Sequence, residues 1–397
     1  MIFPLAPHTP LELVTTCEAG LEAAHAAELR ALGAARVVER RRAVEWAGDR
    51  ALMWRVGLEA RLGNRLLLAL GRFRVRDAND LYDAVSRVDF TRVMTADQTM
   101  AVDSRGSHPN LLRHEYVNQV VKDAICDRFR KEVGRRPDVD RHSPDIPIFV
   151  HLEGDNGALF LDASGEGLHR RGYRARAGIA PLRESLAAAL LTLAEYDPAL
   201  PFVDPMCGSG TIAIEAALVA TRTAPGLLRL RGKGAQGFAF ERWRGHDPGA
   251  FERVVLPLRE QIRPAPAPIL ASDIDPDVLG LVRGNAELAH VSAAITVSRA
   301  DVGDLVAPGP RGLLLTNPPY GERLENEATS IGLHRALGDV LKQRFAGWRA
   351  GVLAGSRPLI SALGLKPTRR FPLWNGPIEC RLILLDLWAR ARPDEAE

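Results

Sequence analysis

The chain has 397 residues, which is long enough for two or three domains that each bury a hydrophobic core. Hydrophobic residues make up 46%, and no apolar run approaches the ~20 residues that a membrane-spanning helix needs. The formal net charge is only +3, so bulk charge does not indicate a nucleic-acid-binding protein. The four cysteines are widely spaced, which argues against a disulfide framework or a zinc site and predicts a reducing, cytoplasmic location.

The first half of the chain predicts two small α+β units. In the first unit the pattern favours strands at 11–15, 36–39 and 43–46, with a helix at 21–32. In the second unit it favours an extended segment at 99–104, a helix at 115–133, and two strands at 146–153 and 157–163. The two last strands are joined by a glycine-rich turn, which is typical of a hairpin.

The second half changes character near residue 165, where we place the main domain boundary. Helices are expected at 182–195, from Gly210 onward and at 341–345, and strands at 201–204, 269–273, 294–299, 312–316 and 350–354. Strands that alternate with helices predict a mostly parallel, doubly wound α/β sheet.

A glycine-containing loop follows the first strand of this half. It runs from Asp204 to Thr211 and leads directly into an apolar helix. Gly208 and Gly210 allow the backbone to approach a ligand closely, and a helix N-terminus favours an anionic group. The loop is neither GxGxxG nor a P-loop, so a dinucleotide or a nucleoside triphosphate is not the first expectation.

Two further carboxylates follow the next strands. Asp273 ends the second strand, where a carboxylate can accept hydrogen bonds from two ribose hydroxyls. Its distance from the glycine loop exceeds the usual ~20 residues because of an insertion between about 222 and 266. Asp275 precedes a proline and is interpreted as a helix cap. Asp301, after the third strand, is placed to accept a hydrogen bond from an adenine amine.

The sequence Asn317-Pro318-Pro319-Tyr320 follows the fourth strand. Two prolines fix the backbone and remove N–H donors, so the loop offers the Asn317 amide oxygen and the Pro318 carbonyl as acceptors. Two acceptors suit a substrate amine, and Tyr320 supplies a flat face for a planar base. This pattern predicts transfer to an amine through positioning and electrostatics, without a metal or a covalent intermediate.

Together these motifs resemble the class I S-adenosylmethionine-dependent methyltransferases that modify exocyclic amines of bases. The resemblance implies a Rossmann-like fold, S-adenosyl-L-methionine as the cofactor and an extra cofactor-side helix that begins near Pro181. It implies that Cys207 and Cys380 have no chemical role, because carbon-methylating enzymes place their nucleophilic cysteine elsewhere. The implied catalytic residues are Asn317, Pro318, Pro319 and Tyr320, and the implied cofactor-binding residues are Asp204, Pro205, Met206, Cys207, Gly208, Ser209, Gly210, Thr211, Asp273, Ile274, Asp301, Pro181 and Leu182.

Motifs in the N-terminal half of the chain indicate one branch of these methyltransferases. Residues 110–118, 121–129, 134–140 and 164–174 resemble the THUMP domain of RNA methyltransferases, which a ferredoxin-like domain precedes. From about residue 11 to 388, the chain is similar to the bacterial THUMP methyltransferases that make 2-methylguanosine in large-subunit ribosomal RNA. The resemblance implies a ferredoxin-like domain at 1–60, a THUMP domain at 61–165 and a methyltransferase domain at 166–390. The chain departs from the many enterobacterial members that carry a second, fused methyltransferase, since 397 residues are too few for one, and a tRNA-specific branch shares this compact layout.

Positive charge is concentrated between residues 169 and 176, where no acid occurs. We predict that Arg170, Arg171, Arg174 and Arg176, together with Lys122, contact phosphates of structured RNA. The alternative is that these arginines pair with carboxylates and fix the joint between the two halves.

Three functions follow from these observations. The first is methylation of the guanosine 2-amino group in structured RNA, with ribosomal RNA as the first substrate and tRNA as the second. Another is methylation of the adenine amine in DNA or RNA, which the Asn-Pro-Pro-Tyr motif would serve equally well. The third is a ribosome assembly factor without catalysis, against which the intact glycine loop and amine motif argue.

Overall fold

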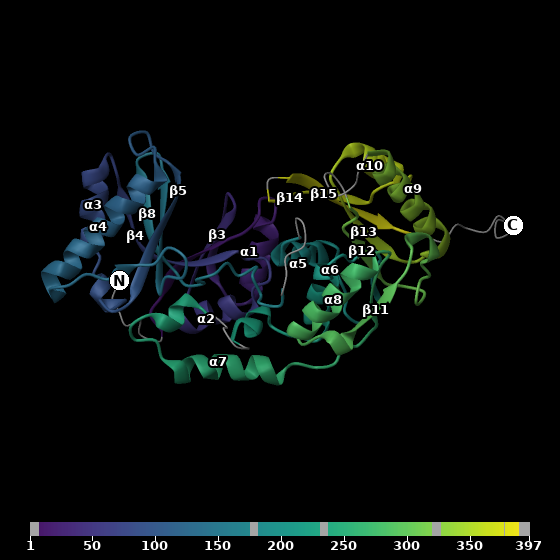
Figure 1. Ribbon diagram of the computed structural model, residues 1–397, viewed down its shortest axis with the longest axis horizontal. Coiled ribbons are helices and arrows are strands. Elements are labelled where there is room, and N and C mark those ends of the chain that lie inside the picture. The colour runs from purple at the N-terminus through teal and green to yellow at the C-terminus, as the bar shows by residue number, and fades with distance from the viewer. Residues whose placement is uncertain (1–7, 175–181, 231–236, 320–326, 377, 389–397) are drawn as a thin grey trace. The chain divides into compact units, whose positions relative to one another are not determined.

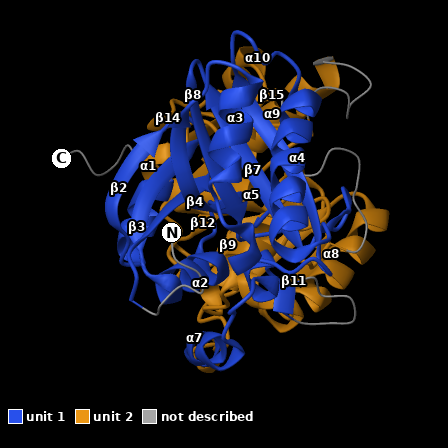
Figure 2. Ribbon diagram, turned by 90° about the vertical axis from the view of Figure 1, so that its left-hand side faces the viewer, with its two compact units in different colours: residues 1–17, 25–168, 229–257 blue, residues 18–24, 169–228, 258–397 orange. Residues whose placement is uncertain are grey.

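The computed structural model describes residues 8–174, 182–230, 237–319, 327–376 and 378–388 (Figure 1). The chain divides into two compact units, shown in different colours in Figure 2. The first unit comprises residues 1–17, 25–168 and 229–257, and the second comprises 18–24, 169–228 and 258–397. The insertion noted in the sequence therefore belongs largely to the first unit.

The first unit is built on an eight-stranded sheet with the order β2-β3-β1-β4-β8-β7-β5-β6. Strand β4 pairs with β1 on one side and with β8 on the other, so residues 11–74 and 99–162 contribute to one continuous sheet. Only β5 pairs in parallel, with β6 and β7. The strands are β1 (Leu11–Thr16), β2 (Ala35–Arg40), β3 (Ala43–Gly48), β4 (Arg65–Arg74), β5 (Thr99–Ser107), β6 (Asp138–Val139), β7 (Ile146–Glu153) and β8 (Asn156–Asp162).

The helices of the first unit begin and end at recognisable signals. The carboxylate of Asp49 caps α2 by accepting from Leu52 N at 2.9 Å, and Gly134 ends α4 in the left-handed region at φ 79°. The helices are α1 (Glu22–Ala31) and α7 (Pro248–Glu260), which both cross the division between the units, together with α2 (Arg50–Glu59), α3 (Ala78–Ser86) and α4 (His114–Val133). Short 3₁₀ turns lie at η1 (Phe90–Arg92) and η3 (Ala239–Arg242).

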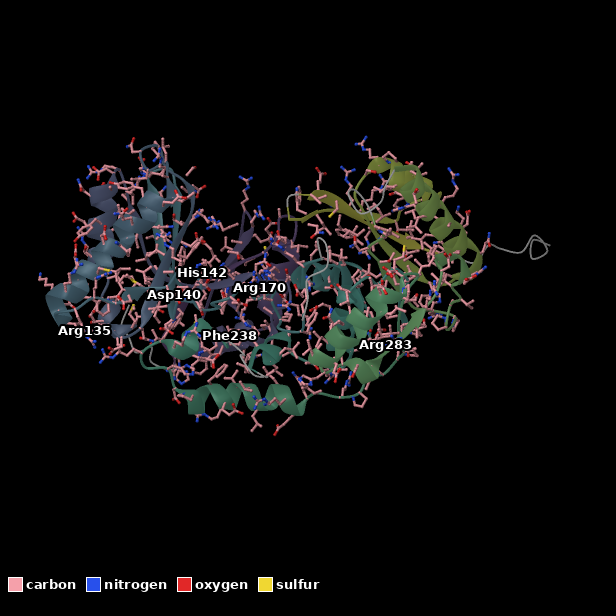
Figure 3. The ribbon with its side chains drawn as sticks, viewed as in Figure 1. Arg135, Asp140, His142, Arg170, Phe238 and Arg283 are labelled. Carbon is pink, nitrogen blue, oxygen red and sulfur yellow. The ribbon has the colours of Figure 1, made fainter. Side chains whose placement is uncertain are left out.

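Aromatic rings fix the inserted segment within the first unit. Phe238, labelled in Figure 3, stacks on Phe240 with ring centroids 5.0 Å apart. Phe240 in turn lies 6.2 Å from Trp54 of α2 and 5.2 Å from Phe251 of α7. Phe238, Phe240 and Trp54 are buried, so this cluster forms a core between the insertion and α2.

The second unit contains a seven-stranded sheet with the order β11-β10-β9-β12-β13-β15-β14. The first five strands are parallel, and β15 and β14 form an antiparallel edge. This arrangement confirms the predicted Rossmann-like α/β fold. The strands are β9 (Phe202–Asp204), β10 (Ile269–Asp273), β11 (Ile295–Arg299), β12 (Leu313–Thr316), β13 (Arg349–Ala354), β14 (Arg369–Asn375) and β15 (Ile378–Asp386).

Helices cover this sheet and supply its core. Leu337 and Leu341 of α9 are buried in a cluster with Leu314 of β12 and Val352 of β13. The helices are α5 (Glu184–Leu193), α6 (Thr211–Ala220), α8 (Pro276–Leu288), α9 (Glu327–Arg344) and α10 (Arg357–Ala362), with 3₁₀ turns η4 (Ser292–Ala294) and η5 (Val302–Asp304) and the turn η2 (Pro225–Leu230), which crosses the division between the units. Within the described ranges, no helix has the length and apolar character to cross a bilayer.

Candidate functional site

The candidate site lies where the strand order of the parallel sheet reverses. Strand β9 is flanked by β10 on one side and by β12 on the other, and all three run in the same direction. Ligands of open α/β sheets bind beyond the carboxyl ends of the strands at such a switch point. Asp204 and Asp273 end β9 and β10, and Asn317 directly follows β12, so the topology brings residues from three distant parts of the sequence to one edge of the sheet.

The loop after β9 is held by hydrogen bonds within the protein. Cys207 N donates to Ser272 O at 3.0 Å, and Gly208 N donates to the Asp273 carboxylate at 2.9 Å. Asn285 of α8 donates to Ser209 O at 3.0 Å. These contacts fix the path of the backbone before α6 begins.

The two glycines of this loop serve different purposes. Gly210 has φ 82°, and a Cβ atom there would lie 2.7 Å from Val282 Cγ1, so packing requires glycine at this position. Gly208 has φ 50°, but a Cβ atom would meet no described atom within 4 Å. The space above Gly208 is therefore open, as expected of a backbone that a ligand approaches closely.

Asp273 connects the second strand to the loop. One carboxylate oxygen accepts from Gly208 N, and the other accepts from Asp275 N at 3.1 Å. Asp275 caps α8 by accepting from Asp277 N at 2.9 Å, which confirms the interpretation of this residue as a helix cap. Ile274, between the two acids, is 57% exposed and lies at the surface of the site.

Asp204 is the most unusual carboxylate of the site. Its side chain is buried, and neither carboxylate oxygen accepts a well-formed hydrogen bond from a described residue. Burial raises its pKa to about 8, with a further contribution from the negative charge of Asp273, and the nearby Thr316 hydroxyl and Met206 amide only partly oppose this. A buried carboxylate that makes no well-formed hydrogen bond is stabilised in its charged form by a ligand that brings a positive charge or donors.

Asp301 caps the short turn η5, where its carboxylate accepts from Gly303 N at 2.7 Å. Its side chain is exposed, and adenine binding there stays a prediction. Cys207 is buried, and burial raises the pKa of its thiol well above the usual range. Cys380 is also buried, with a thiol pKa raised to about 11 by burial. Neither thiol is therefore poised to ionise near neutral pH.

The loop after β12 has few internal partners. Thr316 is fully buried, and its hydroxyl lies near the Asp204 carboxylate but makes no well-formed hydrogen bond to a described residue. The Asn317 amide oxygen is likewise buried and without a partner in the described part of the chain. Pro318 and Pro319 follow, and Tyr320 lies outside the described residues. Buried polar atoms without partners are uncommon, so these two atoms single out the end of β12 as a candidate binding position.

The structure separates the arginines that were predicted to contact RNA. Arg170, labelled in Figure 3, is exposed. Arg171 is only 1% exposed, and its Nε lies 3.7 Å from Glu215 of α6, which also accepts from the Tyr173 hydroxyl at 3.1 Å. A buried guanidinium cannot reach RNA, so the RNA prediction is wrong for Arg171, and the alternative of carboxylate pairing describes it.

Arg174 also faces the protein interior. Its Nη2 lies 3.5 Å from the Glu184 carboxylate and donates to Leu182 O at 2.9 Å and to the Thr211 hydroxyl at 3.2 Å. These contacts fit the alternative of carboxylate pairing for Arg174. Lys122 of α4 is partly buried beside Asp123, at 2.5 Å, while Arg176 and Pro181 lie outside the described residues.

Sequence reasoning missed Glu184 and Glu215 as partners of these arginines. A signal was present, since Glu215 is the single charged residue in the otherwise apolar helix α6, TIAIEAALVA. A lone acid in a helix that is buried on nearly every side requires a buried partner.

Fold and site together define a class I S-adenosylmethionine-dependent methyltransferase: the strand order reverses at a glycine loop, and open space and unsatisfied polar atoms lie at the strand ends. The chain belongs to the RMKL-like methyltransferase family, whose methyltransferase domain matches residues 171–383. Residues 75–162 match the THUMP domain, and residues 12–67 match the RlmL ferredoxin-like domain. These matches confirm the resemblance drawn from the sequence motifs.

Relatives match over nearly the whole chain. A Synechocystis protein named as a candidate RNA methyltransferase is 37% identical over 94% of this chain and 96% of its own length. The Methylococcus capsulatus ribosomal RNA large subunit methyltransferase K/L is 39% identical over 95% of this chain, which spans only 51% of that relative. A methyltransferase structure complexed with SAH has a TM-score of 0.84 and 27% identity, and covers 96% of this chain and 99% of its own.

Two further solved structures cover most of this chain. A Clostridium difficile protein named as a possible methylase has a TM-score of 0.86 and 27% identity, and covers 97% of this chain and 100% of its own. A Listeria monocytogenes protein named as an N6-adenine-specific DNA methylase has a TM-score of 0.84 and 28% identity, and covers 96% and 97%, respectively.

Proposed function

We propose that this protein transfers a methyl group from S-adenosylmethionine to the 2-amino group of a guanosine in structured RNA. The coarser conclusion, an S-adenosylmethionine-dependent methyltransferase that acts on RNA, is supported by the family, the THUMP domain and the names of the two relatives. Large-subunit ribosomal RNA is the substrate we propose, because the Methylococcus relative is named for it. A tRNA guanosine is the alternative within the same chemistry.

The cofactor is proposed to lie across the ends of β9 and β10. The open space above Gly208 would admit the part of the cofactor that packs against the loop backbone. Asp273 would accept hydrogen bonds from the ribose hydroxyls, and the buried Asp204 would face the positive charge of the cofactor. When bound, the cofactor supplies an electrophilic methyl group on sulfur. The residues that we propose to hold it are Asp204, Pro205, Met206, Cys207, Gly208, Ser209, Gly210, Thr211, Asp273, Ile274, Asp301, Pro181 and Leu182.

The amine site carries the proposal. Its central observation is the Asn317 amide oxygen, a buried acceptor at the end of β12 that no described residue satisfies. We propose that Asn317 and the Pro318 carbonyl accept the two amine hydrogens and Pro319 fixes their spacing, while Tyr320 stacks on the base. Acceptors that bind the N–H groups localise the nitrogen lone pair, which would otherwise delocalise into the ring, and orient it toward the methyl group.

RNA binding is proposed for the N-terminal domains, with boundaries at 1–60 for the ferredoxin-like domain and 61–165 for the THUMP domain, before the catalytic domain at 166–390. Arg170, Arg176 and Lys122 remain candidates for phosphate contacts. A base within folded RNA must leave its stack to reach the amine site, at a cost of a few kcal/mol that phosphate contacts can offset.

The deciding experiment incubates the full chain and a tritiated methyl donor with ribosomal RNA, tRNA and DNA, followed by nucleoside analysis of the labelled product. Labelled 2-methylguanosine in large-subunit RNA supports the proposal. The same nucleoside found in tRNA alone would identify tRNA as the substrate instead. Labelled N6-methyladenine, which the name of the Listeria structure suggests as a test, would overturn the guanine assignment.

A further inference from the structure

Arg174 joins two segments of the second unit that flank the proposed cofactor site. Its guanidinium donates to the Leu182 carbonyl, just before α5, at 2.9 Å. The same nitrogen donates to the hydroxyl of Thr211, the first residue of α6, at 3.2 Å. The Thr211 hydroxyl lies 3.4 Å from that of Ser209 in the glycine loop. A cation is thus held at the junction between the glycine loop and the segment before α5.

This guanidinium retains unused donor capacity. Arginine has five N–H donors, but every hydrogen bond from Arg174 to a described residue uses Nη2. Its Nε is buried and has no hydrogen-bond partner among the described residues, and the side chain as a whole is 16% exposed. A buried donor without an acceptor is costly, so the arrangement fits an acceptor that arrives with a ligand.

A carboxylate and a helix N-terminus lie beside the Arg174 guanidinium. Glu184 is the carboxylate beside it, and burial raises the pKa of Glu184 although the guanidinium opposes the shift. The N-terminal turn of α6, which begins at Thr211, adds free backbone N–H groups and the positive end of the helix dipole. Two independent sources of positive potential therefore meet at this end of the glycine loop.

We propose that Arg174 binds the α-carboxylate in the amino-acid portion of S-adenosylmethionine. The inference rests on the proposed cofactor site and adds a residue to it. The adenosine portion of the cofactor carries no anion, so the carboxylate is the one group that a guanidinium and a helix N-terminus would both select. Arg174 would thus bind the amino-acid end of the cofactor, whereas Asp273 would bind the ribose.

Two ligands distinguish this role from a structural one. S-adenosylhomocysteine and 5′-methylthioadenosine share the adenosine and the thioether, but only the former carries the carboxylate and the ammonium. Calorimetry on the full chain should show that Arg174→Gln weakens S-adenosylhomocysteine by about 10- to 100-fold, the worth of a charge-assisted hydrogen bond. The affinity for 5′-methylthioadenosine should not change. The affinity of Arg174→Lys for S-adenosylhomocysteine should lie between those of wild type and Arg174→Gln, because lysine keeps the positive charge but lacks the paired N–H donors of a guanidinium.

Arg283→Gln is the matched control, because Arg283 is an exposed arginine of α8 in the same unit (Figure 3) and its one hydrogen bond to a described residue goes to Val297 O at 3.3 Å. It should leave both affinities unchanged. Equal weakening of both ligands by Arg174→Gln would assign Arg174 a purely structural role and overturn the inference, as would no weakening of either. If Arg174→Gln does not fold, as judged by thermal melting, Arg174→Lys alone decides: an unchanged ratio of the two affinities overturns the inference. Wild-type protein that binds neither ligand would instead refute the proposed cofactor site.

Discussion

The loops after β9 and β12 follow neighbouring parallel strands, but their polar groups differ in whether they are hydrogen-bonded within the protein. In the first loop, Gly208 N, Cys207 N and Ser209 O all have partners within the protein. In the second, the Thr316 hydroxyl and the Asn317 amide oxygen have none among the described residues. One loop is braced, and the other leaves acceptor atoms unsatisfied.

This difference suits two separate roles, ligand binding by the first loop and acceptance of a substrate amine by the second. A loop that wraps a ligand through close backbone approach must hold its geometry before the ligand arrives, and internal hydrogen bonds provide this. An acceptor for a substrate amine must be free until the substrate arrives, because an internal donor would compete for the same oxygen. The contrast predicts that changes in the first loop affect binding and stability, whereas changes in the second affect turnover.

The largest expected effect is on turnover. Asn317→Ala removes the proposed amine acceptor and should slow single-turnover methylation by about 10²- to 10³-fold, like the loss of one oriented polar group in other sites. Cofactor affinity, measured by calorimetry, should stay the same because the braced loop is untouched. Turnover within a few-fold of wild type would contradict the acceptor role.

The next effect concerns the braced loop itself. Gly210→Ala places a methyl group 2.7 Å from Val282 Cγ1 in a left-handed backbone, so the free energy of unfolding should fall by about 2–3 kcal/mol. Gly208→Ala has open space around its Cβ position and should cost stability only through its backbone strain, about 1 kcal/mol. It should still weaken cofactor binding, since the methyl group would occupy the ligand's side of the loop. Denaturant titration and calorimetry of both variants test this division; equal destabilisation would contradict it.

Asp273→Ala should weaken cofactor binding by about 1.5–3 kcal/mol, the range for hydrogen bonds to a charged group. The variant loses both the proposed ribose contact and the acceptor for Gly208 N. Asp275→Ala is the control, because Asp275 caps α8 at the same strand end and should affect stability but not affinity. Calorimetry that shows equal losses in the two variants would argue that Asp273 acts only through the local fold.

The sequence was sufficient for the parallel strands and their terminal motifs, but not for strand β4. Residues 65–74 read RLLLALGRFR, and the buried run Leu66–Ala69 shows no alternation because both faces of this central strand are covered. A short apolar run of this kind cannot be distinguished from a buried helix by its period. The helix expected at 182–195 is shorter than predicted, since α5 ends at Leu193 and Glu195 adopts φ 56°.

The site was predictable where strand ends converge and not where charges pair across the fold. Asp204, Asp273 and Asn317 follow apolar strands, and the parallel topology alone brings them to one edge. The partners of Arg171 could not be found this way, because its run contains no acid and Glu215 lies 44 residues later. Charge balance inside a protein is a tertiary property, which a local count of charges does not reveal.

The smallest expected effect tests Asp204, whose carboxylate oxygens make no well-formed hydrogen bond to a described residue. Burial and the negative charge of Asp273 raise its pKa from the ordinary 3.8 to about 8, so across this interval the folded state keeps a proton that the unfolded state has released. Stability from this group is therefore lost as the pH rises, by about 2 kcal/mol between pH 6 and pH 8. The charged and titratable groups that face it are Asp273 and the Cys207 thiol, and β12 contributes the neutral Thr316 hydroxyl. Asp204→Asn removes the titration, so the difference in unfolding free energy between wild type and variant should change with pH in this direction in denaturant titrations without ligand. A difference that is constant from pH 6 to pH 8 would show that Asp204 is already ionised, and that its charge is balanced within the protein rather than by the cofactor.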